Sequence, residues 1–249
     1  MNRTAIEWTD YTWSPLTGCF GPGGTQEKPN RCPYCYAEKI AKRFPRNFNR
    51  WHLDSFIPSF KPERLDQPGK VKKPSKIFVC SMADLFGDWI PTDWITAVLE
   101  QVYRNPQHTF QFLTKNPKRL RDFNPWPSNC WVGTTVTNQA DADERIPWLL
   151  RVEAPVRFVS HEPLLGDMVV DHYLFEDEFG NRGQHFVGDY KVPFDGINWV
   201  IIGAMTGPSA VKPDPAWVQG LIDQYRAAGV PVFLKDNLKW PEKIQEWPR

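Results

Sequence analysis

The sequence predicts an α/β fold, a partial or near-closed parallel barrel, and two observations support this prediction. After residue 75, short apolar runs alternate with helix-patterned segments, which is typical of βαβ units around a parallel sheet. The 249 residues are 41% hydrophobic and 24% charged, so the chain can bury a sizeable core and shows no compositional sign of disorder. We therefore expect a single domain over residues 1–249.

Seven strands are expected from the pattern of apolar and β-branched residues. The first covers residues 5–13, where the β-prone Trp, Thr and Tyr recur. Six short apolar runs follow, as in buried parallel strands, at residues 76–80, 109–113, 130–136, 156–160, 199–203 and 232–234.

Helices are expected between these strands. In residues 32–44, Tyr36, Ile40 and Phe44 recur at a spacing of four and share one helix face, and Pro45 ends the pattern. Four more helices are expected at residues 92–105 with Thr92 as N-cap, from Asn116 with the following proline at the first position, at 139–150 and at 215–228.

Two segments interrupt this alternation. Residues 45–75 carry five prolines and little periodicity, so we expect a long connection that is too extended to be a simple loop. Residues 167–197 contain a turn-like Phe-Gly-Asn-Arg-Gly run, and we expect an inserted β-ribbon on a strand-to-helix loop.

The basic residues concentrate early in the chain. Between residues 26 and 76, thirteen basic and five acidic residues give a charge of +8, which leaves −7 elsewhere because the net charge is +1. With Phe44, Phe48, Trp51 and Phe56 interleaved, this basic segment 26–76 is a candidate nucleic-acid contact, and the alternative is a solvated surface connection.

No run of about 18 apolar residues is present, so no membrane contact by a spanning helix is expected. The first residues also lack the apolar core of a signal peptide. We therefore expect a cytoplasmic protein, where free or metal-bound thiols persist and disulfides are rare.

Three of the five cysteines lie in one loop, residues 14–36. Cys32 and Cys35 form a C-x-x-C pair, and Cys19 precedes them across a Gly/Pro-rich stretch. Thiolates bind iron–sulfur clusters or zinc, and three are an incomplete set for structural zinc. The alternatives are zinc with a distant histidine such as His52, a redox-active C-x-x-C pair, a disulfide or inert thiols. Cys80 and Cys130 lie in apolar runs and are expected to be buried.

Polar residues follow the ends of the expected strands. In parallel α/β barrels such ends share one rim, which carries the chemistry. Capping of the following helices is the simpler alternative for several of them. The candidate rim residues are Ser81, Asp84, Lys115, Thr137, Asn138, Glu162 and Gly203.

The cysteine loop, with Tyr36 directly after Cys35, resembles the cluster loop of the radical S-adenosylmethionine superfamily. More closely, the chain resembles a family of phage and bacterial three-cysteine, radical-SAM-like proteins of unknown function. The resemblance is carried by residues 6–10, 13–19, 32–38, 79–87, 112–117, 136–139, 142–147, 160–166, 199–203 and 228–233.

This resemblance implies a 4Fe-4S cluster on Cys19, Cys32 and Cys35, with S-adenosylmethionine on the fourth iron. It implies cleavage of that cofactor to a 5′-deoxyadenosyl radical, using an electron from a flavodoxin- or ferredoxin-like donor. The rim residues named above would hold cofactor and substrate, and the basic segment 26–76 suggests a nucleic-acid-related substrate. Zinc- or cluster-binding without catalysis, in a nucleic-acid-interacting protein, is the rival hypothesis.

Two departures from the superfamily pattern stand out. The usual spacing is C-x3-C-x2-C, whereas twelve residues separate Cys19 from Cys32 here. Residues 203–207 read Gly-Ala-Met-Thr-Gly in place of the family's Gly-Gly-Glu-Ser-Gly, which removes a carboxylate from the rim. The second departure leaves open a degenerate member that holds a cluster without turning over S-adenosylmethionine.

Overall fold

The computed structural model describes residues 1–48, 54–174, 196–207 and 210–248. The chain divides into two compact units, the first made of residues 1–119 and 126–131, and the second of 120–125 and 132–249. Most of the expected β-ribbon lies outside the described residues. Within the described ranges, no helix has the length and hydrophobicity that crossing a bilayer requires.

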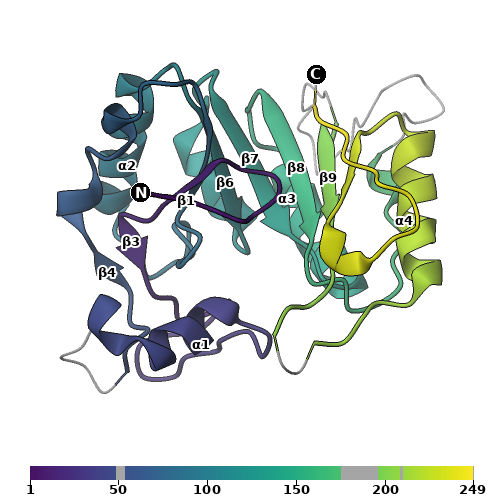
Figure 1. Cartoon of the computed structure of the whole chain (residues 1–249), viewed down its shortest axis with the longest axis horizontal. Coiled ribbons are helices and arrows are strands. Elements are labelled where there is room, and N and C mark those ends of the chain that lie inside the picture. The colour runs from purple at the N-terminus through teal and green to yellow at the C-terminus, as the bar shows by residue number, and fades with distance from the viewer. Residues whose placement is uncertain (49–53, 175–195, 208–209, 249) are drawn as a thin grey trace, which may run out of the picture. The chain divides into compact units, whose positions relative to one another are not determined.

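The first unit is an α/β unit that contains parallel and antiparallel strands (Figure 1). The strand order is β1-β2-β5-β6, in which β2, β5 and β6 are parallel and β1 is antiparallel to β2. A separate antiparallel pair is formed by β3 and β4. The elements are β1 (Asn2–Arg3), β2 (Tyr11–Trp13), β3 (Leu16–Thr17), α1 (Tyr36–Arg43), β4 (Ser59–Phe60), β5 (Lys76–Val79), α2 (Thr92–Arg104) and β6 (Thr109–Thr114).

The second unit repeats this alternation with strand order β7-β8-β9-β10, and helix α4 contacts β10. Strands β8, β9 and β10 are parallel. The elements α3 (Gln139–Leu149), β8 (Val156–His161), η5 (Asp171–Tyr173), β9 (Trp199–Ile202), α4 (Pro215–Ala227), β10 (Val232–Leu234) and η6 (Asp236–Leu238) lie in this unit. The short helix η4 (Pro117–Phe123) and β7 (Cys130–Thr135) have their first residues in the range of the first unit and the rest in the range of the second.

The predicted α/β class and the mostly parallel strands are confirmed, whereas closure into a barrel stays a prediction. Six of the seven expected strands appear within a residue of their expected bounds. The first is much shorter than expected, because Thr9 N–H donates to Ile6 O and Thr4 N–H to Asp10 O, which makes a turn before β2.

Three helix predictions need correction, in the first residue, the cap residue or the type of the helix. The helix expected from residue 32 begins at Tyr36, since Cys32 to Cys35 form a turn before it. Pro91, not Thr92, is the N-cap residue of α2. The segment after Asn116 forms the 3-10 helix η4, with the Asn116 side chain donating to Phe86 O and Asp88 Oδ1 instead of capping.

The proline-rich connection is largely irregular and folds back on the start of the chain. Trp13 Nε1 donates to Arg64 O at 2.7 Å, and Lys61 N–H donates to Pro15 O at 2.7 Å. Strand β4 adds main-chain pairing to β3. The connection contains the short helices η1 (Pro45–Asn47), η2 (Pro62–Arg64) and η3 (Pro68–Lys70). Its contacts with Pro15 and β3 hold the first residues of the cysteine loop in place.

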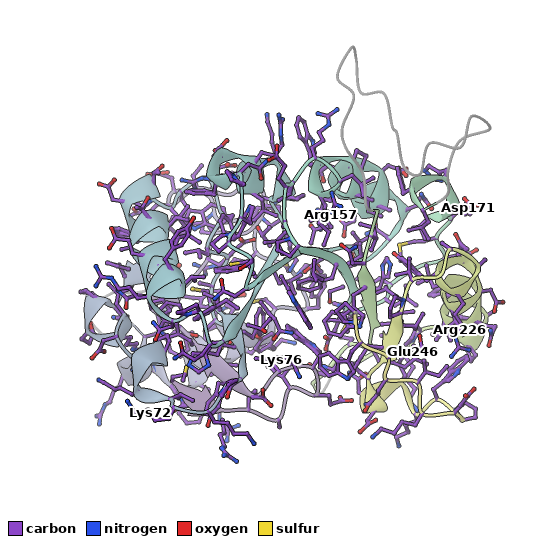
Figure 2. The ribbon with its side chains drawn as sticks, turned by 90° about the horizontal axis from the view of Figure 1, so that it is seen from above. Lys72, Lys76, Arg157, Asp171, Arg226 and Glu246 are labelled. Atoms are coloured by element: carbon purple, nitrogen blue, oxygen red, sulfur yellow. The ribbon has the colours of Figure 1, made fainter. Side chains whose placement is uncertain are left out.

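The last described residues tie β9, β10 and α4 together in the second unit. Trp199 Nε1 donates to Glu246 O at 2.8 Å, and the Trp247 ring stacks on Trp199 at 5.1 Å between centroids. Arg226 of α4 lies close to Glu246 (Figure 2), and their ion pair measures 3.0 Å. The Glu246 carboxylate also accepts from Val232 N–H.

His161 at the end of β8 is buried with both ring nitrogens hydrogen-bonded. Nδ1 lies 2.9 Å from Val136 O, and Nε2 lies 2.9 Å from the Tyr225 hydroxyl. Because a carbonyl only accepts, Nδ1 carries the proton and Nε2 accepts from Tyr225. Burial lowers the pKa of His161 to about 4, so the neutral ring is the form that fits this site.

We expect the free energy of unfolding to fall as the pH decreases from about 6.5 to about 4. In this window the unfolded state protonates His161 and the folded state does not, so acid favours unfolding. The slope for this one proton approaches about 1.4 kcal/mol per pH unit. Urea denaturation across the pH series measures it.

The matched pair of variants is His161→Gln and His172→Gln, since the His172 side chain is about half exposed on η5. The His161 variant should lose the extra slope and the His172 variant should keep it. Equal slopes in the two variants would contradict the role of His161.

Candidate metal centre and polar rims

The C-x-x-C pair folds as a turn that starts helix α1. Cys35 N–H donates to Cys32 O at 2.9 Å, and the Cys35 backbone is extended. The Cys35 thiol then caps the helix, because its Sγ accepts from Glu38 N–H at 3.4 Å. This arrangement places both thiols at the N-terminus of α1, where the helix dipole favours negative charge.

Cys19 is held in place through its backbone. Its N–H donates to Phe56 O at 3.0 Å, and the preceding Gly18 donates to Met82 O at 2.9 Å. Gly18 has φ of +90°, and a Cβ there would lie 2.2 Å from Ile57 O, so only glycine allows this close approach. The Cys19 Sγ accepts from Gly21 N–H at 3.2 Å.

The thiols lie in one partly buried neighbourhood. Cys19 and Cys35 pack against a small core of Ala37, Ala41 and Phe56. Burial raises the pKa of the Cys19 thiol to about 12, and it is also the main cause of the raised pKa of Cys35. A neighbouring cysteine adds to each of these two shifts, since Cys35 raises the pKa of Cys19 and Cys32 raises the pKa of Cys35. Metal binding at Cys19 and Cys35 would displace the protons that these two thiols hold at neutral pH.

The three cysteines offer sulfur donors for either zinc or an iron–sulfur cluster. In the part of the chain that the structure describes, no three His, Cys, Asp or Glu side chains form a group that could hold one metal ion. Zn–S bonds of about 2.3 Å would bring thiolates on one zinc within about 4 Å of each other. Thiolates that accept backbone N–H bonds, as Cys19 and Cys35 do, are soft donors of the kind that an iron–sulfur cluster takes. Binding of a cluster or of zinc at these cysteines stays a prediction, and His52 lies outside the described residues.

Three predicted rim residues belong to the same neighbourhood in the first unit. Asp84 accepts from Thr114 Oγ1 at 2.6 Å and from Lys115 N–H at 2.9 Å, which fixes the end of β6 beside it. The negative charge of Asp84 raises the pKa of Cys19, and the positive charge of Lys115 lowers it. Ser81 O accepts a hydrogen bond from the Tyr36 hydroxyl. The structure thus brings Ser81, Asp84 and Lys115 to the cysteine loop.

Thr137 and Asn138, in the second unit, are engaged in a helix cap. Asn138 Oδ1 accepts from Asp141 N–H at 3.0 Å, and the Thr137 hydroxyl donates to Asp141 Oδ2 at 2.6 Å. Arg145 reinforces this cap through a 2.6 Å ion pair to Asp141. The capping alternative therefore accounts for both side chains, and a role in binding a cofactor stays a prediction.

Glu162 and Gly203 meet at the ends of β8 and β9 in the second unit. Glu162 pairs with Lys235 at the end of β10, and the side chains are 23% and 12% exposed. A Cβ on Gly203 would lie 3.0 Å from Lys235 Cδ and 3.2 Å from Glu162 Cγ, so this glycine leaves the room that the ion pair occupies. These three residues form a charged group on a polar rim.

Sequence reasoning missed three residues of these sites. The sequence did not predict Lys235 as a site residue, because it follows a strand of only three residues and lies far from Glu162 in the sequence. Asn237 makes two hydrogen bonds to the backbone of Ala204, of 3.0 and 2.9 Å, and fixes the chain after β9. Arg31 lies in the cysteine loop and donates from Nε to Cys19 O of the same loop. The one available signal was position: Lys235 directly follows an expected strand, as the other rim residues do.

A cysteine-bearing loop on an α/β fold with mostly parallel strands defines a protein similar in fold to spore photoproduct lyase. A structure of that enzyme with a dinucleoside spore photoproduct matches with a TM-score of 0.56 at 12% identity, covering 94% of this chain and 79% of that one. A cysteine-to-serine variant gives 0.53 over the same shares, also at 12% identity. A double variant with bound AdoMet and the dinucleoside gives 0.50 at 12% identity, covering 90% and 63%.

The family itself is shown by sequence. Residues 3–246 match the model described as "Protein of unknown function (DUF5131)", and the chain belongs to this family. None of the curated proteins matches it.

Replacing Lys235 should destabilise the second unit. Lys235→Met keeps the length of the aliphatic stem and leaves the Glu162 carboxylate without its cation, at a cost of about 1–2 kcal/mol in the free energy of unfolding. Chemical denaturation measures the change. The control is Lys212→Met at an exposed position, which should be neutral. A Lys235 variant as stable as the control would show that the pair contributes nothing.

Proposed function

We propose that this protein is a radical S-adenosylmethionine enzyme whose 4Fe-4S cluster is held by Cys19, Cys32 and Cys35. The observation that carries this proposal is the set of three thiols in one partly buried loop, two of them accepting backbone N–H bonds. The similar fold of spore photoproduct lyase, a radical SAM enzyme, supports the same class. The fold, on this proposal, is the partial barrel typical of that superfamily.

The bound cofactors would supply the one-electron cleavage of S-adenosylmethionine that yields a 5′-deoxyadenosyl radical. The chain's own residues hold and shield the site. Asp84 fixes the start of the segment at Lys115, whose cation lies near Cys19 and over the Tyr34 ring at 5.7 Å. Phe56, Ala37 and Ala41 pack against Cys19 and Cys35 and exclude water from that side of the two thiols. A flavodoxin- or ferredoxin-like protein would deliver the electron.

We propose nucleic acid as the substrate class, and helix α1 supports this choice. Its surface exposes Lys39, Lys42 and Arg43 next to Ile40 and Phe44, and the Arg43 guanidinium lies over the Phe44 ring at 5.2 Å. Cations beside aromatic rings suit phosphates and stacked bases. Helix α1 begins one residue after Cys35, so this surface belongs to the helix that the thiol caps. The structurally similar lyase binds a dinucleoside, which belongs to the same chemical class as the substrate proposed here.

Anaerobic reconstitution tests the enzyme class. The native chain should bind about four irons per protein and, after reduction, convert S-adenosylmethionine to 5′-deoxyadenosine, measured by mass spectrometry. Cys19/Cys32/Cys35→Ala should bind no iron and form no product. The control is Cys130→Ala, a buried cysteine outside the loop, which should keep the iron.

Other results of the same experiment are decisive. Iron without product would identify a cluster-holding protein that does not turn over S-adenosylmethionine. One zinc and no iron would refute the radical proposal.

Binding of short DNA oligonucleotides tests the substrate class. At low salt we expect a Kd on the order of 10⁻⁵ M that weakens as salt rises. Lys39→Glu/Arg43→Glu should weaken binding roughly tenfold, because two phosphate contacts become repulsive. The control reverses two exposed charges elsewhere, Arg104→Glu and Lys212→Glu. Equal effects of the two pairs, or no binding, would remove the nucleic-acid proposal.

A further inference from the structure

The twelve residues between Cys19 and Cys32 contain a loop that closes on itself. Asn30 N–H donates to Phe20 O at 2.7 Å, so the chain returns to the point from which it left. The point where Phe20 and Asn30 meet is called the neck of the loop. The Asn30 side chain donates to Pro22 O at 2.8 Å and adds a second bond at this neck. Residues 21–29 form a nine-residue excursion between these two ends.

Glycines make the neck of this excursion narrow. A Cβ on Gly21 would lie 1.9 Å from Asn30 O, and one on Gly24 would lie 2.2 Å from Phe20 O. Gly21 also has φ of +82°, a conformation that favours glycine. Inside the excursion, Gly24 N–H donates to Gly21 O, and Thr25 and Lys28 bond each other twice. The excursion is therefore folded by its own contacts.

Arg31 binds the neck to the rest of the cysteine site. Its Nε donates to Cys19 O at 2.9 Å, across the whole loop. Its two terminal nitrogens pair with Glu38 of α1 and with Asp54, and the guanidinium lies over the Phe56 ring at 5.4 Å. The side chain is 12% exposed. One arginine thus connects the backbone of the first cysteine to the helix that the third cysteine caps.

We propose that residues 21–29 are a separable insertion in the ligand loop, and that Arg31 is the positioning residue that brings Cys19 to Cys32 and Cys35 across it. Without the nine inserted residues, three residues (Phe20, Asn30 and Arg31) separate the first two cysteines. Two residues separate the second and third, so the spacing becomes C-x3-C-x2-C. This inference rests on the proposed function for the role of the cysteines as cluster ligands.

Deletion of the insertion is the direct test. One variant joins Phe20 to Asn30, and a second retains Gly21 as a one-residue linker in case the direct joint is strained. At least one should fold, by circular dichroism and thermal melting, and bind as much iron as the native chain. The loop-tip variant Glu27→Gln/Lys28→Gln is the control and should also bind native iron.

Arg31→Ala supplies a second measurement. In the full chain it should speed the loss of iron to a chelator by about 10- to 100-fold, as expected for a residue that orients metal ligands. In the deletion variant a peptide bond replaces the contact across the neck, so the same substitution should have a smaller effect. Equal effects in the two backgrounds would overturn the positioning role.

The outcomes separate this inference from the proposed function. If the native chain binds iron and both deletion variants fold without iron, the insertion is part of the ligand site and the inference fails alone. In the iron-free protein, amide exchange at Asn30 should be slower than at Gln26 and Glu27, since only Asn30 N–H is held across the neck. Rapid exchange at Asn30 would overturn the closed loop whatever metal is bound. Absence of iron from the native chain would overturn the proposed function and, with it, the ligand role of Arg31.

Discussion

The hydrogen bond from the Cys19 amide to the Phe56 carbonyl joins two segments of the first unit that are remote in sequence, and the cysteine loop depends on it. It ties the first thiol to the proline-rich connection, which is itself paired to the start of the chain through β3 and β4. The conformational entropy lost in ordering an irregular connection has to be offset by such contacts. The connection is therefore a structural brace for the thiols, and its prolines limit the freedom that folding removes.

Strands such as β5 and β9 could be predicted because each is a continuous apolar run, a pattern set by burial on both faces. Helix α1 was predicted to start too early, since a thiol is not among the usual capping side chains and its bond to Glu38 N–H has no sequence signature. The β3–β4 pair was missed because Ser59–Phe60 shows no periodicity. The pairing of two such short strands, far apart in the sequence, can be seen only in the folded structure.

The candidate sites divide in the same way, into residues with a local sequence signal and residues whose partners are remote in the sequence. The three cysteines carried a spacing signal, and the structure places them in one neighbourhood. Glu162 was marked because a carboxylate beyond an apolar strand must be solvated or paired, but its partner Lys235 lies 73 residues away in the sequence. Thr137 and Asn138 show the reverse case: residues at a strand end whose polar groups are satisfied by the local cap. Position at a rim thus selects candidates, and hydrogen bonds decide which of their atoms are still available.

The closed neck at Phe20 and Asn30 separates two quantities that a sequence motif treats as one: the number of residues between two cysteines, and the distance between them. A loop that folds by its own contacts can lengthen or shorten without moving its two ends. The part of such a segment under tight geometric constraint is then the neck, with the arginine beside it and the glycines Gly21 and Gly24 that pack against it, and the rest of the excursion can diverge. Recognition of thiol sites by fixed spacing passes over chains built in this way.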